Sequence, residues 1–387
     1  MNKLNKDKWI ETDIGSVADE INEKISNPAE SGCERFVRPE DLEIGDLYVK
    51  SFRSPEDVGS GKFCNTGDIL FTRRSVSVSQ FKRRSGILKF DGVCSDEITV
   101  IRQNNNKLYP EFLNLILNTS NLWEFAIARS VGSVSKRIKW EDLSKYRFSL
   151  PREKKEQQQI VALFQNIEKA LDQVDGQEKN LKALQKSLAE GLIIPEPKFG
   201  NLLNKKNCTP TTFGEIAECD KRYPEHEKEV ERFVGLENIE TDNFQLQGFG
   251  LIANGTTFTK RFVKGDVLFG KRRAYLKKVA VANFDGICSG DILVIRSKPN
   301  KMLQKLLPFY ISADTFIQHA VTTSAGSLSP RTKWKDLADL EVSIPDIKTQ
   351  ETILEIFTQL QRTLQQLNQQ KSTLKNLKQK LLNEILG

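Results

Sequence analysis

Two stretches of the chain carry dense positive charge and no acidic residue. They read TRRSVSVSQFKRRSGILK (72–89) and GKRRAYLKKVAVAN (270–283). Arginine and lysine beside hydroxyl groups are the side chains that contact DNA phosphates and the acceptor edge of guanine. A single charge run usually marks a solvated surface, but two such loops favour DNA contact. The candidate residues are Arg73, Arg74, Lys82, Arg83, Arg84, Lys271, Arg272, Arg273, Lys277 and Lys278.

A second basic element also occurs twice. SVGSVSKRIKWEDL (130–143) and SAGSLSPRTKWKDL (324–337) each place a Gly-Ser turn before a run of basic residues. Hydroxyl groups and cations on a turn again suit phosphate contacts. The candidates here are Ser133, Lys136, Arg137, Lys139, Ser327, Arg331, Lys333 and Lys335.

Residue patterns for catalysis or metal binding are largely missing. The six cysteines form no CxxC pair and there are two histidines, so the sequence predicts no metal site and no disulfide framework. Cys94 and Cys288 lack a histidine at a matching place, which argues against nucleophiles. GSGKF (59–63) has Phe63 where a phosphate loop needs Ser or Thr. We therefore predict a non-catalytic chain that binds no cofactor itself.

The chain is a tandem duplication. FDGVCSDEITVIR (90–102) and FDGICSGDILVIR (284–296) share nine of thirteen residues, 194 positions apart. The two Gly-Ser segments share nine of fourteen at the same offset, and GDILF (67–71) matches GDVLF (265–269). Repeats at matched spacing predict two similar domains. The basic loops lie where the copies diverge, with eighteen residues in one and fourteen in the other.

Each globular segment has an α+β pattern. GDILF, EITVIR and DILVIR are apolar, β-branched runs typical of strands, whereas segments 109–128 and 306–321 are typical of helices. Phe90, Asp91 and Gly92 are predicted to form a turn into a core strand. Cys94 and Cys288 are predicted to be small buried thiols.

A heptad pattern follows each globular segment and predicts a coiled coil. Each heptad segment has a main row of apolar residues and a second row beside it. The second row contains Phe164, Leu171, Phe357 and Leu364, and it becomes polar at Glu178, Gln185 and Lys371. The alternative is two amphipathic helices, each packed on its own domain. The main row consists of Ile160, Ile167, Val174, Leu181 and Leu188 in one copy and Ile353, Leu360, Leu367, Leu374 and Leu381 in the other.

The order of segments predicts that the two helices run antiparallel. The first helix should end near Gly191, because Pro195 and Pro197 follow. Only a short linker then precedes the second domain, so the second helix should run back along the first. We therefore expect a dumbbell-shaped protein with a pseudo-twofold axis through its middle. The expected boundaries are 1–152 for the first globular domain, 153–194 for the first helix, 195–208 for the linker, 209–346 for the second globular domain and 347–387 for the second helix.

Composition agrees with a globular chain that meets nucleic acid. The 387 residues are 38% hydrophobic with a formal net charge of +7, which is compatible with DNA binding without requiring it. No apolar run approaches a membrane span, and MNKLNKDKWI lacks the hydrophobic stretch of a signal peptide. We therefore expect a cytoplasmic protein.

The order of blocks resembles the specificity subunit of type I restriction-modification systems. Both halves contain GDILF-type, FDGxCSxxIxVIR-type and GSxSxRxKWxDL-type segments followed by a heptad helix. The resemblance implies two target recognition domains, each reading half of a bipartite DNA target. It also implies two adenine methyltransferase (M) subunits and ATP-dependent restriction (R) subunits as partners. S-adenosylmethionine, ATP and Mg²⁺ would belong to those partners.

Because the two basic loops differ, the two half-sites should differ, which gives an asymmetric, interrupted target. Two other classes of protein stay open. The chain could be a stand-alone DNA-binding regulator with two reading heads, or a nuclease whose metal site the sequence does not reveal.

Overall fold

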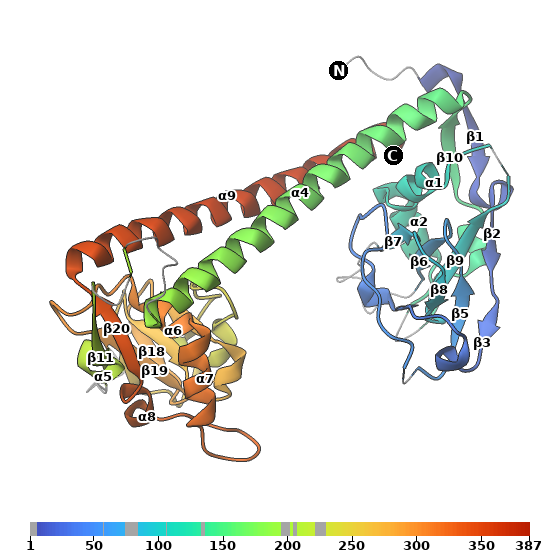
Figure 1. Ribbon diagram of the computed structural model, residues 1–387. Coiled ribbons are helices and arrows are strands. Elements are labelled where there is room, and N and C mark those ends of the chain that lie inside the picture. Colours follow the sequence, from blue (N-terminus) through green and yellow to red (C-terminus); the bar gives the residue numbers. More distant parts are fainter. Residues whose placement is uncertain are drawn as a thin grey trace. The chain divides into compact units, whose positions relative to one another are not determined.

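A computed structural model describes residues 6–56, 58–73, 84–105, 107–132, 136–194, 202–203, 207–220 and 230–387. The chain divides into two compact units. Unit 1 comprises Met1–Gly176 and Asn368–Gly387, and unit 2 comprises Gln177–Leu367. Each unit therefore contains one globular domain and half of each long helix (Figure 1).

Unit 1 is built on two four-stranded sheets with strand orders β2-β9-β6-β7 and β3-β5-β8-β4, and β1 pairs with β10. Its strands are β1 (Trp9–Asp13), β2 (Ala18–Ile21), β3 (Lys24–Ile25), β4 (Phe36–Val37), β5 (Gly61–Cys64), β6 (Ile69–Thr72), β7 (Ser85–Ile87), β8 (Gly92–Cys94), β9 (Ile98–Gln103) and β10 (Arg147–Pro151). Its shorter helices are α1 (Pro110–Leu117), α2 (Ser120–Arg129) and α3 (Trp140–Leu143).

Unit 2 repeats this plan with sheets β12-β19-β16-β17 and β14-β13-β18-β15 and the pair β11-β20. Its strands are β11 (Cys208–Thr212), β12 (Ala217–Asp220), β13 (Arg232–Val234), β14 (Gly250–Leu251), β15 (Lys260–Phe262), β16 (Val267–Gly270), β17 (Val279–Val281), β18 (Gly286–Cys288), β19 (Ile292–Ser297) and β20 (Glu341–Pro345). Its shorter helices are α5 (Phe213–Ile216), α6 (Leu307–Ser312), α7 (Asp314–Thr322) and α8 (Trp334–Ala338). The α+β class and the tandem repeat are thus confirmed.

The repeated GDILF and VIR blocks form the centre of one sheet in each unit. β6 pairs antiparallel with β9, and β16 with β19. The buried carboxylate of Asp68 accepts two bonds from the Arg102 guanidinium, at 2.7 and 2.8 Å. Asp266 and Arg296 make the same bidentate contact at 2.8 Å. Such charge-assisted pairs are strong and directional, so they fix the same strand register in both units.

The FDG phrase forms the predicted turn into a core strand. Gly92 opens β8, and a Cβ at this position would lie 2.7 Å from the Arg35 carbonyl oxygen. The same approach occurs at Gly286, whose Cβ would lie 2.7 Å from the Arg232 carbonyl oxygen. Only glycine fits without a backbone shift. At the end of the strand, Cys94 is fully buried, as predicted.

The two predicted helical segments are each divided in two. Thr119 interrupts the first one: its backbone is extended, and its hydroxyl accepts a bond from the Leu122 amide, which caps α2. Ala313, with extended backbone, separates α6 from α7. Pro110 and Pro308 lie in the first turns of α1 and α6, where proline is tolerated.

The two long helices, α4 (Lys154–Ile193) and α9 (Ile347–Leu386), run antiparallel where unit 1 contains both (Figure 1). Lys378 of α9 forms an ion pair with Glu168 of α4. Lys371, seven residues earlier in α9, pairs with Asp175, seven residues later in α4. This order confirms the predicted direction. The first long helix ends close to the predicted place, because α4 continues two residues past the buried Gly191 and ends at Ile193.

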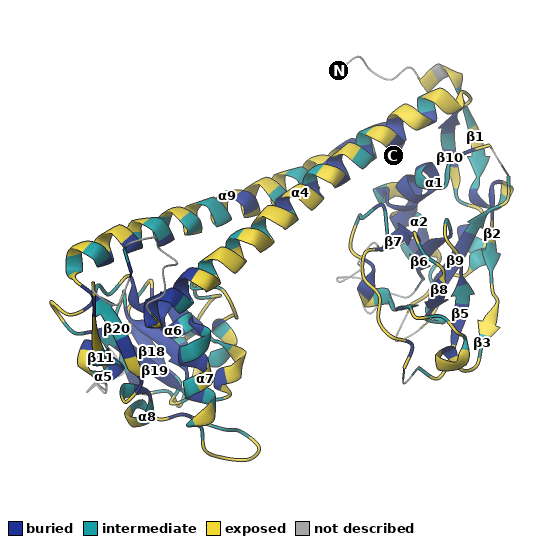
Figure 2. Ribbon diagram, viewed as in Figure 1, coloured by how far each residue is buried: buried dark blue, intermediate teal, exposed yellow. Residues whose placement is uncertain are grey.

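The predicted heptad row lies on the covered side of both helices, where burial alternates along the ribbon (Figure 2). Leu181, Leu360 and Leu374 are half-buried. In unit 1 the row packs with Phe164 and Leu171 against the globular core. In unit 2 the Phe357 ring stacks on Phe309, with ring centroids 4.0 Å apart. The buried members of the row are Ile160, Ile167, Val174, Leu188, Ile353, Leu367 and Leu381.

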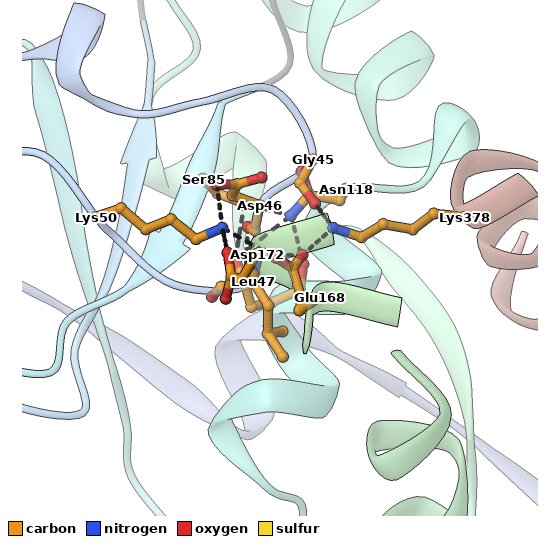
Figure 3. Close-up of polar contacts among 10 residues, drawn as sticks. Gly45, Asp46, Leu47, Lys50, Ser85, Asn118, Glu168, Asp172 and Lys378 are labelled. Atoms are coloured by element: carbon orange, nitrogen blue, oxygen red, sulfur yellow. Dashed lines mark hydrogen bonds and ion pairs between the residues drawn. The ribbon is translucent and has the colours of Figure 1, made fainter. Parts of the chain in front are cut away.

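A buried polar cluster joins α4, α9 and the 45–50 segment within unit 1 (Figure 3). The Glu168 carboxylate receives the Lys378 ammonium, the Leu47 amide at 3.1 Å and the Lys50 ammonium at 3.4 Å. Lys378 also donates to the Gly45 carbonyl. Lys50 lies 2.7 Å from Asp172. The cluster therefore fixes the helix pair to the domain through charged hydrogen bonds.

The cluster shifts the pKa values of two of its outer members. Burial, reinforced by the nearby Glu168 charge, raises the pKa of Asp46 above its ordinary range. Burial alone would lower the pKa of Lys50, but its bond to Asp172 and the attraction of Asp46 and Glu168 raise that pKa above its usual value. Lys50 is therefore charged at any physiological pH.

No helix in the described part of the chain is both long and apolar enough to span a lipid bilayer.

Candidate nucleic-acid interface

In unit 2 the basic hairpin loop and the Gly-Ser segment lie against each other. The Arg273 amide donates to the Pro330 carbonyl at 2.8 Å, and the Thr332 amide donates to the Lys271 carbonyl at 3.1 Å. Arg273 and Lys277 have left-handed backbones and flank a short 3₁₀ helix, Ala274–Leu276. Two segments about sixty residues apart thus form one basic surface at the end of β16.

The side chains of this surface are ordered by one carboxylate. Asp291 accepts two bonds from the Arg331 guanidinium, at 2.7 and 3.3 Å, and Arg272 lies 3.6 Å away. The Arg272 Nε also donates to the Ser329 hydroxyl at 2.6 Å. The bond from Arg331 holds the pKa of Asp291 below its usual range. Asp291 is therefore ionised and orients both arginines.

Unit 1 has the same backbone arrangement. The Ile138 amide donates to the Arg73 carbonyl at 3.0 Å, as Thr332 does to Lys271. Val131 and Arg137 form a β-bridge, as Ala325 and Arg331 do. The Arg73 guanidinium donates to the Asp96 carbonyl at 2.5 Å. In unit 1 the described ends of the two basic segments, at Arg73 and Ile138, are thus brought together as Lys271 and Thr332 are in unit 2.

The predicted basic residues divide into two groups. Lys277 forms an ion pair with Asp314 at 2.5 Å, Lys278 donates to the Leu236 carbonyl at 2.6 Å, and Arg84 donates to the Pro39 carbonyl at 2.8 Å. These three side chains are thus engaged by acceptors within the protein. Others are exposed, and the described residues give their side chains no polar partner: Lys136, Arg137, Lys139, Arg273, Lys333 and Lys335. Lys271 is half-buried and Ser327 is exposed. Arg74, Lys82, Arg83 and Ser133 lie outside the described residues.

The sequence reasoning missed three residues of this surface. Asp291 was overlooked because it belongs to the repeated strand phrase rather than to a basic run. Ser329 was passed over in favour of the neighbouring Gly-Ser turn. Leu328 is 90% exposed in the same segment, next in sequence to Ser329. A leucine between two serines in an otherwise polar turn was the available signal.

A metal site, a cysteine nucleophile and a phosphate-binding loop find no support in the described residues. No group of three His, Cys, Asp or Glu side chains there could hold a metal ion. Burial raises the pKa of the Cys288 thiol to about 12, so it stays protonated and is a poor nucleophile at neutral pH. Lys62 of GSGKF is buried in β5 and donates to the Ile98 carbonyl, so it does not face a phosphate.

Comparison with known proteins identifies relatives of this chain. A curated relative, the type I restriction enzyme EcoDI specificity subunit of Escherichia coli, is 29% identical over 137 residues, which cover 34% of this chain and 30% of that protein. The match thus spans less than a third of the relative's length.

Solved structures share the fold over the whole chain. One, described as the structural basis of complex assembly and conformational transition of the type I R-M system, superposes with a TM-score of 0.59 at 17% identity and covers 98% of this chain and 97% of the other. The S subunit of a type I restriction-modification system from M. genitalium superposes with a TM-score of 0.54 at 14% identity and covers 100% and 98%.

The sequence profile of one family matches both halves, at residues 13–183 and 213–376. These two matches take in most of both units and both long helices. The chain belongs to the family of type I restriction modification DNA specificity domains.

Proposed function

We propose that the chain is the DNA-binding specificity subunit of a type I restriction-modification complex and recognises a bipartite, asymmetric target. The observation that carries this proposal is the duplicated contact between the basic loop and the Gly-Ser segment. In both units a backbone hydrogen bond joins the two, Arg73 to Ile138 and Lys271 to Thr332. Separate basic segments that converge twice are what two DNA-reading heads require.

Each head combines groups for phosphates with groups for bases. In unit 2, Arg273, Lys333 and Lys335 are exposed cations suited to phosphates. Arg272 and Arg331 are held in place by Asp291, and an oriented guanidinium is the group that reads the guanine edge. Leu328 adds an apolar group of the kind that contacts a thymine methyl.

The two heads should read different half-sites. The basic loop has eighteen residues in one copy and fourteen in the other, and their sequences differ. The half-site spacing would be set by the long helices, as dimer geometry sets the spacing of palindromic operators.

The complex would contain two adenine methyltransferase (M) subunits and ATP-dependent restriction (R) subunits. This chain would supply recognition and no catalysis. S-adenosylmethionine, ATP and Mg²⁺ would be bound by those partners, and the DNA substrate would place the complex in the cytoplasm. A solved structure with the same fold is described in terms of complex assembly of the type I R-M system, which supports the proposal that this chain acts within a complex.

Co-expression with the methyltransferase subunit tests this proposal. We expect the two proteins to purify together, and the isolated chain with Mg²⁺ to leave DNA intact. A chain that binds DNA specifically without the methyltransferase partner would instead be a regulator. Cleavage by the isolated chain would show a nuclease.

Affinity for DNA should depend steeply on salt. If the exposed lysines and arginines contact about six phosphates, the logarithm of the affinity should fall against the logarithm of the salt concentration with a slope of about −5. Fluorescence anisotropy across a salt series measures this slope. A flat response would contradict electrostatic recognition by the basic surfaces.

A further inference from the structure

The repeated FDG phrase also builds a surface that DNA recognition does not explain. In unit 1 the Arg35 guanidinium lies over two rings, 5.2 Å from the Phe52 centroid and 5.0 Å from the Phe90 centroid. The two rings meet edge to face with centroids 5.1 Å apart. Phe52 is 48% exposed. We call these three residues the Arg-Phe stack of unit 1.

Unit 2 contains the same stack. The Arg232 guanidinium lies 4.5 Å from the Phe249 centroid and 5.2 Å from the Phe284 centroid. The rings again meet edge to face, at 5.5 Å, and Phe249 is 45% exposed. The sequence around each arginine is also repeated, as ERFV at 34–37 and 231–234. Position, geometry and exposure are therefore duplicated.

In each unit the stack and the basic surface lie at opposite ends of one strand, which is β8 in unit 1 and β18 in unit 2. Phe90 precedes β8, whereas Asp96, which follows it, accepts the bond from Arg73. Likewise Phe284 precedes β18, whereas Asp291 follows it and holds Arg331. A three-residue strand is about 10 Å long. A stack and the basic surface of the same unit are thus separated by the length of the strand.

Each stack presents a guanidinium and an exposed ring. Within the described residues neither Arg35 nor Arg232 forms an ion pair; the Asp91 carboxylate, which accepts its bonds from Thr66, attracts Arg35 without pairing with it. A guanidinium held between rings keeps its N–H edge for an acceptor, and carboxylates fit that edge best. The surface therefore complements a carboxylate beside an apolar side chain.

We infer that the two stacks dock two identical protein subunits, one per unit. The inference rests on a comparison of the two copies, in which some segments differ and others have the same residues. The basic loops diverged in length and sequence, as two different half-sites demand, whereas the stacks kept the same three residues, as one partner bound twice demands. This inference rests on the proposed function, in which the partner present in two copies is the methyltransferase subunit.

The test substitutes one exposed ring at a time. In the co-expressed complex, Phe52→Ala and Phe249→Ala should each weaken one methyltransferase site by about tenfold or more, because aromatic anchors dominate interface energies. Native mass spectrometry at limiting concentration should then show one bound copy instead of two, and none for the double variant. Arg35→Gln and Arg232→Gln should act in the same direction.

Ile44→Ala is the matched control, because Ile44 is 50% exposed and belongs to no stack. The control should keep two copies, and every variant should keep the wild-type unfolding temperature and DNA affinity. Two copies bound with unchanged affinity in both Phe variants would overturn the inference and leave the proposed function standing. A wild-type chain that binds no methyltransferase would overturn both.

Discussion

Replacing Glu168 with alanine should destabilise unit 1 by about 3–5 kcal/mol, the usual cost of removing one member of a buried ion pair. The Lys378 side chain is 9% exposed and has the Glu168 carboxylate as its ionic partner (Figure 3). Without that carboxylate, a buried ammonium would retain only the Gly45 carbonyl. The Leu47 amide would lose its acceptor as well. Hydrogen exchange of backbone amides in α4 and α9 measures the loss unit by unit.

Two variants make this prediction specific. Lys380→Ala removes a lysine that is 72% exposed and lies 3.8 Å from Glu384, so it should change stability by less than about 0.5 kcal/mol. Glu168→Leu combined with Lys378→Met removes both charges and should recover much of the lost stability. Wild-type exchange rates in Glu168→Ala would show that the cluster does not hold the helix pair to the domain.

Adjacent arginines in the basic loop should have different effects on DNA binding. Arg272 is oriented by Ser329 and Asp291, so Arg272→Ala should cost about 1–3 kcal/mol on the specific target and relax preference at one position of one half-site. Arg273 is exposed with no side-chain partner among the described residues, so Arg273→Ala should weaken binding to all sequences alike and reduce the salt slope by about 1.

Competition binding with single-base variants of the target separates these outcomes. The first arginine should show a changed base profile, and the second an unchanged profile with lower affinity throughout. Equal losses on all sequences in Arg272→Ala would reduce Arg272 to a phosphate contact.

The features predictable from the sequence were those that repeat with a regular period. The heptad row identified α4 and α9, and the apolar runs identified β6, β9, β16 and β19, because helix and strand periods are local properties of the chain. The order of these segments was enough to predict the antiparallel direction of the helices. The duplication identified both basic segments as candidates for DNA contact, but it did not indicate that they lie against each other.

Features that depend on contacts between distant segments could not be predicted. Glu168 had no visible role in the sequence, because its partners come from the 45–50 segment and from α9. Its counterpart in the other copy of the heptad pattern, Gln361, is exposed, so the repeat gave no signal.

The same reason explains the errors within the basic surface. Lys277 and Arg84 looked like free cations, yet one pairs with Asp314 and the other with the Pro39 carbonyl. Net charge predicts that a surface is basic, but which cations are available depends on acceptors supplied by other elements.

The most direct test of two-headed recognition is a base-resolution map of methylated adenines in DNA from cells that express this chain with its methyltransferase. We expect a single two-part motif with a fixed unspecified gap and unequal halves, and in Arg272→Ala a relaxed base in one half with the other half unchanged. A continuous motif, a symmetric one, or a change in both halves from this one substitution would contradict recognition by two independent units.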